Sequence, residues 1–106
     1  MTSISLQKAR TVIARIRAKG KELGLNPLAI VVLDAGGNLK AFEREDGTSN
    51  KRVEIAYGKA YGAIGFGAST RKVTEIANER PQFIAGVRSA FGGHLVPSPG
   101  GLLIHD

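Results

Sequence analysis

The chain has 106 residues, of which 42% are hydrophobic, and its formal net charge is +6. This length indicates one domain, residues 1–106, and the apolar content excludes a disordered chain. No segment approaches the ~20 apolar residues of a membrane span, and the N-terminus lacks the pattern of a signal peptide. The sequence has no cysteine, which excludes disulfides and thiolate metal sites and suits a cytoplasmic protein.

The N-terminal segment predicts an amphipathic helix from about Leu6 to Leu23, with Ser5 as its N-cap. Six of the fifteen Lys and Arg residues fall between Lys8 and Lys21. A solvated helix face explains this charge better than a nucleic-acid surface, because no aromatic residues alternate with the basic ones to stack on bases. We therefore expect neither a nucleic acid nor a membrane as a partner.

A β-hairpin is predicted next. Leu28–Leu33 is continuously apolar, Asp34–Asn38 is a turn, and Leu39–Phe42 resumes as a strand. The glycines of the turn do not open a helix, so a phosphate site lacks the helix dipole that would stabilise it. A structural turn is the better interpretation.

A second helix should run from a cap at Ser49 or Asn50 to about Phe66. Three glycines inside this helix indicate that another backbone or a flat ligand approaches closely, and close packing of the helix on the sheet is the favoured explanation. Tyr57 and Tyr61 lie one helical turn apart and suit either core packing or a flat ligand surface.

The rest of the chain predicts a third helix from Thr70 to Arg80, where Pro81 ends it. Gln82–Ala90 adds one or two helical turns, and His94–Val96 pairs with Leu102–Ile104 as two antiparallel strands. The order helix-strand-strand-helix-helix-strand-strand defines an α+β fold with an antiparallel sheet.

Few residues have the chemistry of a site. His94 and His105 are the only histidines, and His94 has the smaller neighbours. A single imidazole can ligate haem iron or act as a general base, although each histidine alone more often sits half-buried at a strand end. Lys59 stands among small residues, and Arg44 ends the second predicted strand. No spacing typical of a protein-only metal site occurs, so we expect none.

Five short motifs carry a resemblance to a known family. In chain order they are Val31–Leu39 (V-V-D-x-G-G-x-L), Arg44–Gly47 (R-x-D-G), Gly58–Tyr61 (G-K-A), Phe66–Thr70 (F-G-x-x-T) and Val96–Gly101 (P-x-P-G-G). On these motifs the chain resembles the GlcG/HbpS family of haem-binding or haem-degrading proteins. It is similar as well to the C-terminal domain of PduO-type corrinoid adenosyltransferases.

The resemblance implies a profilin-like fold, in which helices flank an antiparallel sheet, and a tendency to form oligomers. It also implies haem binding for some members, while others accompany catabolic pathways. Relatives continue after the P-G-G strand with a further strand and a helix, so this domain is expected to be C-terminally short. A neighbouring subunit or a second chain should then complete the sheet at Leu102, Leu103 and Ile104.

The first functional hypothesis is a small-ligand-binding oligomer that takes haem or a related flat acidic ligand, with His94 as an axial ligand. The second is an enzyme for a small acidic or aromatic metabolite, in which Lys59 and Arg44 bind the carboxylate and His94 moves protons. The third is an accessory module that pairs through its terminal strand. Lys59 and His94 are the catalytic candidates. The candidate ligand-binding residues are Arg44, Tyr61, Pro97, Pro99, Gly100 and Gly101.

Overall fold

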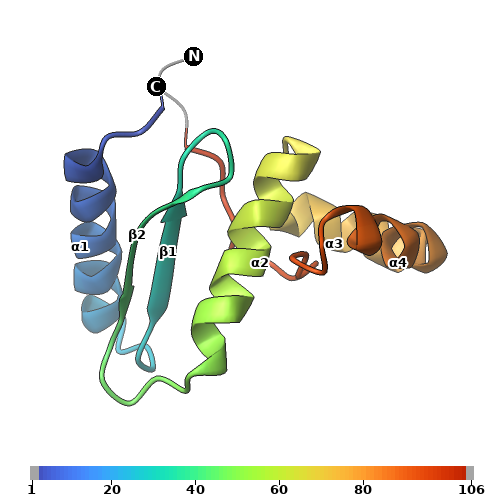
Figure 1. The fold of residues 1–106 in the computed structure, drawn as a ribbon. Helices are drawn as coiled ribbons and strands as arrows, with labels where there is room; N and C mark the ends of the chain where they lie inside the picture. Colours follow the sequence, from blue (N-terminus) through green and yellow to red (C-terminus); the bar gives the residue numbers. More distant parts are fainter. Residues whose placement is uncertain (1–2, 105–106) are drawn as a thin grey trace. The chain divides into compact units, whose positions relative to one another are not determined.

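The computed structural model describes residues 3–104. It confirms the α+β class, with four helices and an antiparallel sheet of two strands (Figure 1). The chain divides into two compact units, Met1–Glu54 and Ile55–Asp106, and each is described on its own. The elements are α1 (Leu6–Glu22), β1 (Ala29–Leu33), β2 (Leu39–Arg44), α2 (Lys51–Phe66), α3 (Thr70–Glu79) and α4 (Pro81–Ala90).

In the first unit, α1 packs along the β1–β2 hairpin (Figure 1). The hydroxyl of Ser5 accepts a hydrogen bond from the Lys8 N–H at 3.1 Å, which confirms the predicted N-cap. Ala9 and Ile13 of α1 meet Ile30 and Val32 of β1 in a buried apolar cluster. Residues one helical turn apart and residues two apart on a strand share a face, so these two patterns bring four side chains into one core.

The hairpin turn is held by its own aspartate. Oδ1 of Asp34 accepts hydrogen bonds from the N–H groups of Gly36 at 3.0 Å and Asn38 at 2.9 Å. These bonds, the one from Asn38 first, lower the pKa of Asp34 below its usual value. The carboxylate occupies the donors that a phosphate would need, so the predicted structural turn is confirmed.

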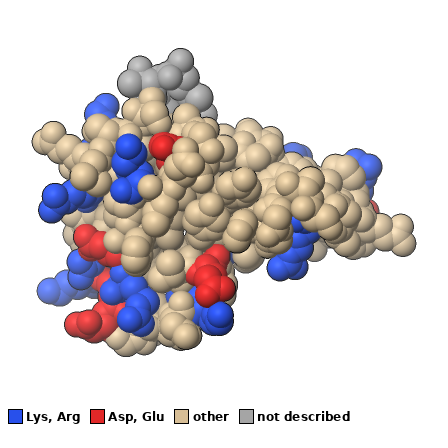
Figure 2. All heavy atoms as spheres, viewed as in Figure 1, with Lys and Arg blue, Asp and Glu red and all other residues tan. Residues whose placement is uncertain are grey.

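An ionic network joins α1 to β2. The guanidinium of Arg17 donates to Glu43 at 2.7 Å and to Glu45 at 3.0 Å, and Glu45 also accepts the Leu28 N–H at 2.7 Å. Figure 2 shows the resulting mixture of basic and acidic side chains over α1. The Leu28 bond and then Arg17 lower the pKa of Glu45, and both carboxylates, Glu45 first, raise that of Arg17.

In the second unit, Leu95 and Val96 of the C-terminal segment pack against glycines of α2. A Cβ at Gly58 would lie 2.6 Å from a methyl of Val96, and one at Gly62 would lie 2.6 Å from Leu95. Leu95 is fully buried and packs with residues of α3 and α4. The predicted close approach to these glycines is confirmed: side chains of Leu95 and Val96 make it, together with the Val96 backbone nitrogen, which lies 3.4 Å from a Cβ at Gly58. The segment that makes it within this unit is residues 91–96, which the sequence did not indicate.

The two predicted C-terminal strands are wrong. Within residues 3–104, neither His94–Val96 nor Leu102–Ile104 forms a strand, and Gln82–Ala90 belongs to a helix of 10 residues. The Val96 N–H donates to the carbonyl of Gly58 in α2 at 3.3 Å, the Ser98 N–H donates to the carbonyl of Val96 at 2.9 Å, and Pro97 and Pro99 have no N–H. Residues 96–99 therefore have no donors left for a strand ladder that would continue His94–Val96. Pairing of Leu102–Ile104 with another chain stays a prediction.

None of the helices found in residues 3–104 has the length and apolar composition that crossing a membrane requires.

Candidate functional site

A group of aromatic side chains lies at one face of α2 and is here called the aromatic site: Tyr57 and Tyr61 of α2, and His94 from the segment after α4. The two tyrosine rings stack with their centroids 5.6 Å apart. The His94 ring stands edge-on to Tyr57 at 5.1 Å and to Tyr61 at 6.0 Å. His94 is exposed, whereas the tyrosines are half-buried. The arrangement therefore presents an oriented imidazole on an aromatic base.

The backbone on both sides fixes the position of His94. After α4 the chain reverses through Gly92 and Gly93, whose φ angles of 62° and 82° favour glycine. The His94 N–H donates to the carbonyl of Phe91 at 3.0 Å, and the next residue, Leu95, is buried against Gly62. His94 thus sits between a closed turn and a core anchor, which limits the directions its ring can take.

A second group, here called the glycine-turn site, comprises Lys59, Gly100, Gly101 and Thr70. A Cβ at Gly100 would lie 3.2 Å from the ammonium nitrogen of Lys59. Gly101 donates its N–H to the buried Thr70 hydroxyl at 2.7 Å, and its carbonyl accepts the Thr70 N–H at 2.9 Å. These bonds attach the Pro97–Gly101 turn to the start of α3.

The two sites lie on opposite faces of α2. With 3.6 residues per turn, Lys59 is roughly 160° around the helix from Tyr57 and from Tyr61. The structure therefore brings His94 to Tyr61 and Lys59 to Gly100 and Gly101, but it does not join the two groups in one pocket. Arg44 belongs to the other unit, where its guanidinium donates to the carbonyl of Thr48 at 2.8 Å.

Sequence reasoning missed Thr70 as a site residue. The sequence predicted it only as the start of the third helix, yet it is fully buried and holds the turn through two hydrogen bonds with Gly101 and a longer contact at 3.3 Å. The signal was present in the F-G-x-x-T motif, which ends at this residue. Phe91 was also missed. Its ring meets Tyr61 at 6.0 Å and Phe66 at 5.5 Å and extends the aromatic surface.

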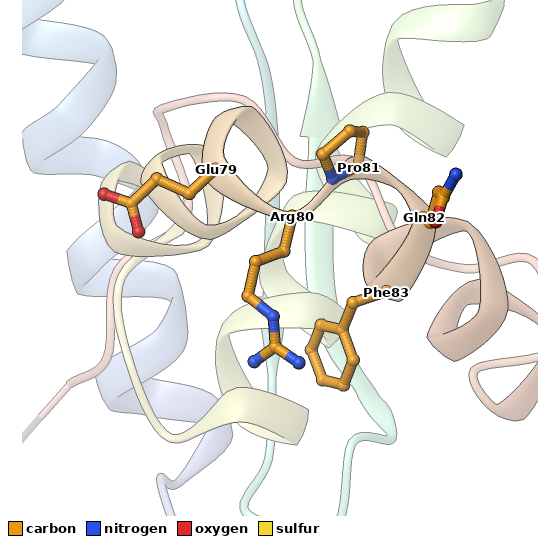
Figure 3. Close-up of a pocket in the computed structure, with 5 residues that line it drawn as sticks. All are labelled: Glu79, Arg80, Pro81, Gln82 and Phe83. Carbon is orange, nitrogen blue, oxygen red and sulfur yellow. The ribbon is translucent and has the colours of Figure 1, made fainter.

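The junction of α3 and α4 forms an open hollow (Figure 3), lined by Glu79, Arg80, Pro81, Gln82 and Phe83. The Arg80 guanidinium lies 4.3 Å from the centroid of the Phe83 ring, so its charge already has an aromatic partner. Among residues 3–104, no three His, Cys, Asp or Glu side chains gather as a metal site. The aromatic and glycine-turn sites remain the candidates.

The sequence and the fold of this chain were compared with those of known proteins. A family model described as "Haem degrading protein HbpS-like" matches residues 4–106. The chain belongs to the HbpS-like family. The HbpS-like chain is also similar to a crystal structure, that of Klebsiella pneumoniae protein ORFY of the family DUF336. The TM-score is 0.87 at 23% identity, over 100% of this chain and 72% of that one, which supports the shared fold. A search of curated proteins finds no match.

Proposed function

We propose that this HbpS-like protein binds haem at the aromatic site, where His94 would hold the iron. The observation that carries the proposal is the exposed His94 ring, held edge-on to Tyr57 at 5.1 Å and Tyr61 at 6.0 Å. Membership of a family described as haem degrading supports a haem-related role. Within that general role, haem is the proposed ligand, the aromatic site is the proposed place, and His94 is the proposed ligating residue.

The residues of the aromatic site fit the chemistry of haem. A neutral imidazole is a common axial ligand, and it must be accessible and oriented, as His94 is. Tyr57, Tyr61 and Phe91 offer apolar ring surface for contact with a flat macrocycle. When bound, haem would supply iron-centred redox or oxygen chemistry. The chain's own part would be to hold the iron through His94 and to contact the ring through Tyr57 and Tyr61.

The same geometry gives less support to a catalytic pair made of Lys59 and His94. A general base acts within hydrogen-bond reach of the proton that it takes. Lys59 and the aromatic site are on opposite faces of α2, so one small metabolite would not contact both. For the same reason Lys59 would not pair with the propionates of a haem at the aromatic site.

Titration of the purified protein with hemin tests the proposal. We expect a shifted Soret band that saturates at a fixed stoichiometry, and we expect His94→Ala to lose it while its circular dichroism spectrum stays native. His105→Ala is the matched control, because His105 is the other histidine of the sequence and lies outside the described residues. An unchanged Soret band in His94→Ala would overturn the assignment of His94.

A further inference from the structure

Lys59 combines partial burial with an ammonium group that has no partner within residues 3–104. The side chain is half-buried in the middle of α2. The lysines that form ion pairs in the described chain are Lys19, Lys51 and Lys72, each with a glutamate three residues further on, and the other ion pairs use Arg17. None of the side-chain hydrogen bonds between described residues involves the Lys59 ammonium either. A cation in these surroundings is available to an anionic ligand.

The Pro97–Gly101 turn is shaped around this lysine. Gly100 has a φ of 129°, which L-residues with side chains rarely adopt. A Cβ at this position would lie 3.3 Å from Cδ and 3.2 Å from Nζ of Lys59, so the stem of the lysine runs against the turn. A side chain at Gly100 would strain the turn and press against the Lys59 ammonium, and glycine avoids both effects.

The turn is also held rigidly. The bonds between Gly101 and Thr70 are buried, and a Cβ at Gly101 would lie 2.5 Å from the carbonyl oxygen of Lys59. The turn is thus in direct contact with the backbone of the residue whose ammonium it flanks. Such pre-organisation reduces the entropy that a ligand must offset on binding.

We propose that Lys59 and the Pro97–Gly101 turn form a binding site for a small carboxylate, separate from the haem site. A single ammonium is a compact charge that matches one carboxylate. A phosphate is usually bound by several free amides at a helix N-terminus. Here the α3 amides of Thr70, Lys72 and Val73 already donate to Gly101 and Ser69. Neither His94 nor the tyrosines belong to this carboxylate site, so the two sites can be tested independently.

The test is an NMR titration of the full chain, labelled with ¹⁵N, with acetate as the probe and chloride as the balancing salt. We expect saturable shifts of the Gly100 and Gly101 amide signals in the millimolar range. Lys59→Met keeps the length of the apolar stem and removes the charge, so these shifts should fall at least tenfold. Lys72→Met is the matched control, because Lys72 is an exposed lysine paired with Glu75, and it should respond like the wild type.

Two results would overturn the proposal: no saturable shift of the turn signals, or shifts that persist in Lys59→Met. Equal shifts of the turn signals with phosphate at the same ionic strength would contradict the carboxylate assignment, because the site would then bind anions in general. If Lys59→Met failed to fold, Lys59→Gln would be titrated in its place, with the same two contradicting results. In His94→Ala the shifts caused by acetate should equal those of the wild type, whether or not that variant binds hemin.

Discussion

The two units of the chain are stabilised by different means. In Met1–Glu54, charged side chains tie the elements together, since Arg17 joins α1 to two glutamates of the hairpin region and Asp34 closes the turn. In Ile55–Asp106, glycines let backbones approach, and the long-range side-chain bonds of this unit run between Thr70 and Gly101. Aromatic rings also stack on one another in this unit.

This difference underlies the choice of the two proposed sites. In the first unit, Arg17, Arg44, Glu43 and Glu45 all have partners within the described chain. In the second unit, the ring of His94 is exposed, and the ammonium of Lys59 has no partner among residues 3–104. These four side chains of the first unit thus contribute to its stability, whereas His94 and Lys59 of the second unit are the groups on which the two proposed sites rest.

The largest effect should come from the core of the second unit. Leu95→Ala removes a fully buried side chain that packs on Gly62 and should lower the free energy of unfolding by about 2–5 kcal/mol. Leu102→Ala is the control, because Leu102 is 76% exposed, and it should change the free energy by about 0.5 kcal/mol or less. Urea denaturation measures both. Equal losses would contradict the assignment of Leu95 to the core.

A smaller loss should follow when a Cβ enters the glycine turn. Gly101→Ala places a methyl against the Lys59 carbonyl, where backbone must move, and should cost about 1–3 kcal/mol. Gly86→Ala is the matched control inside α4, where a Cβ meets nothing within 4 Å. It should stabilise the protein by about 0.5–1 kcal/mol. Thermal unfolding separates the two, and a neutral Gly101→Ala would show that the turn is not rigid.

The smallest effect should be the acid sensitivity of the first unit. Hydrogen bonds from Leu28 and Arg17 lower the pKa of Glu45, and the bond from Asn38 is the main cause that lowers that of Asp34. A carboxyl with a lowered folded pKa adds stability above its unfolded pKa and loses it as pH falls through the folded value. The melting temperature should therefore fall between about pH 5 and pH 2. Glu45→Gln should show a shallower fall, and an identical profile would refute this role for Glu45.

Much of the first unit could be predicted from the sequence because its signals are local. The apolar spacing of Leu6–Leu23 specifies the helix α1, and the composition of Asp34–Asn38 specifies the turn of the hairpin. The C-terminal region could not be predicted in the same way. His94–Val96 has the composition of a strand, but the Val96 N–H finds a helix carbonyl at Gly58, a contact across 38 positions that no local pattern encodes.

The candidate site was predicted in its parts but not in its arrangement. Lys59, Tyr61, His94 and the Pro97–Gly101 turn all come from motifs or residue chemistry, and the structure places them in one unit. Their division between two faces of α2 depends on the path of residues 91–101 across Gly58 and Gly62, which is set by tertiary packing. The anchoring by Thr70 depends on the same path.

The central claim is that the two faces of α2 bind different ligands. The most direct measurement is a hemin titration of Lys59→Met beside His94→Ala, followed in the Soret region. We predict that Lys59→Met keeps the wild-type Soret band and stoichiometry and that His94→Ala loses the band. Loss of the band in Lys59→Met, or its retention in His94→Ala, would contradict the claim.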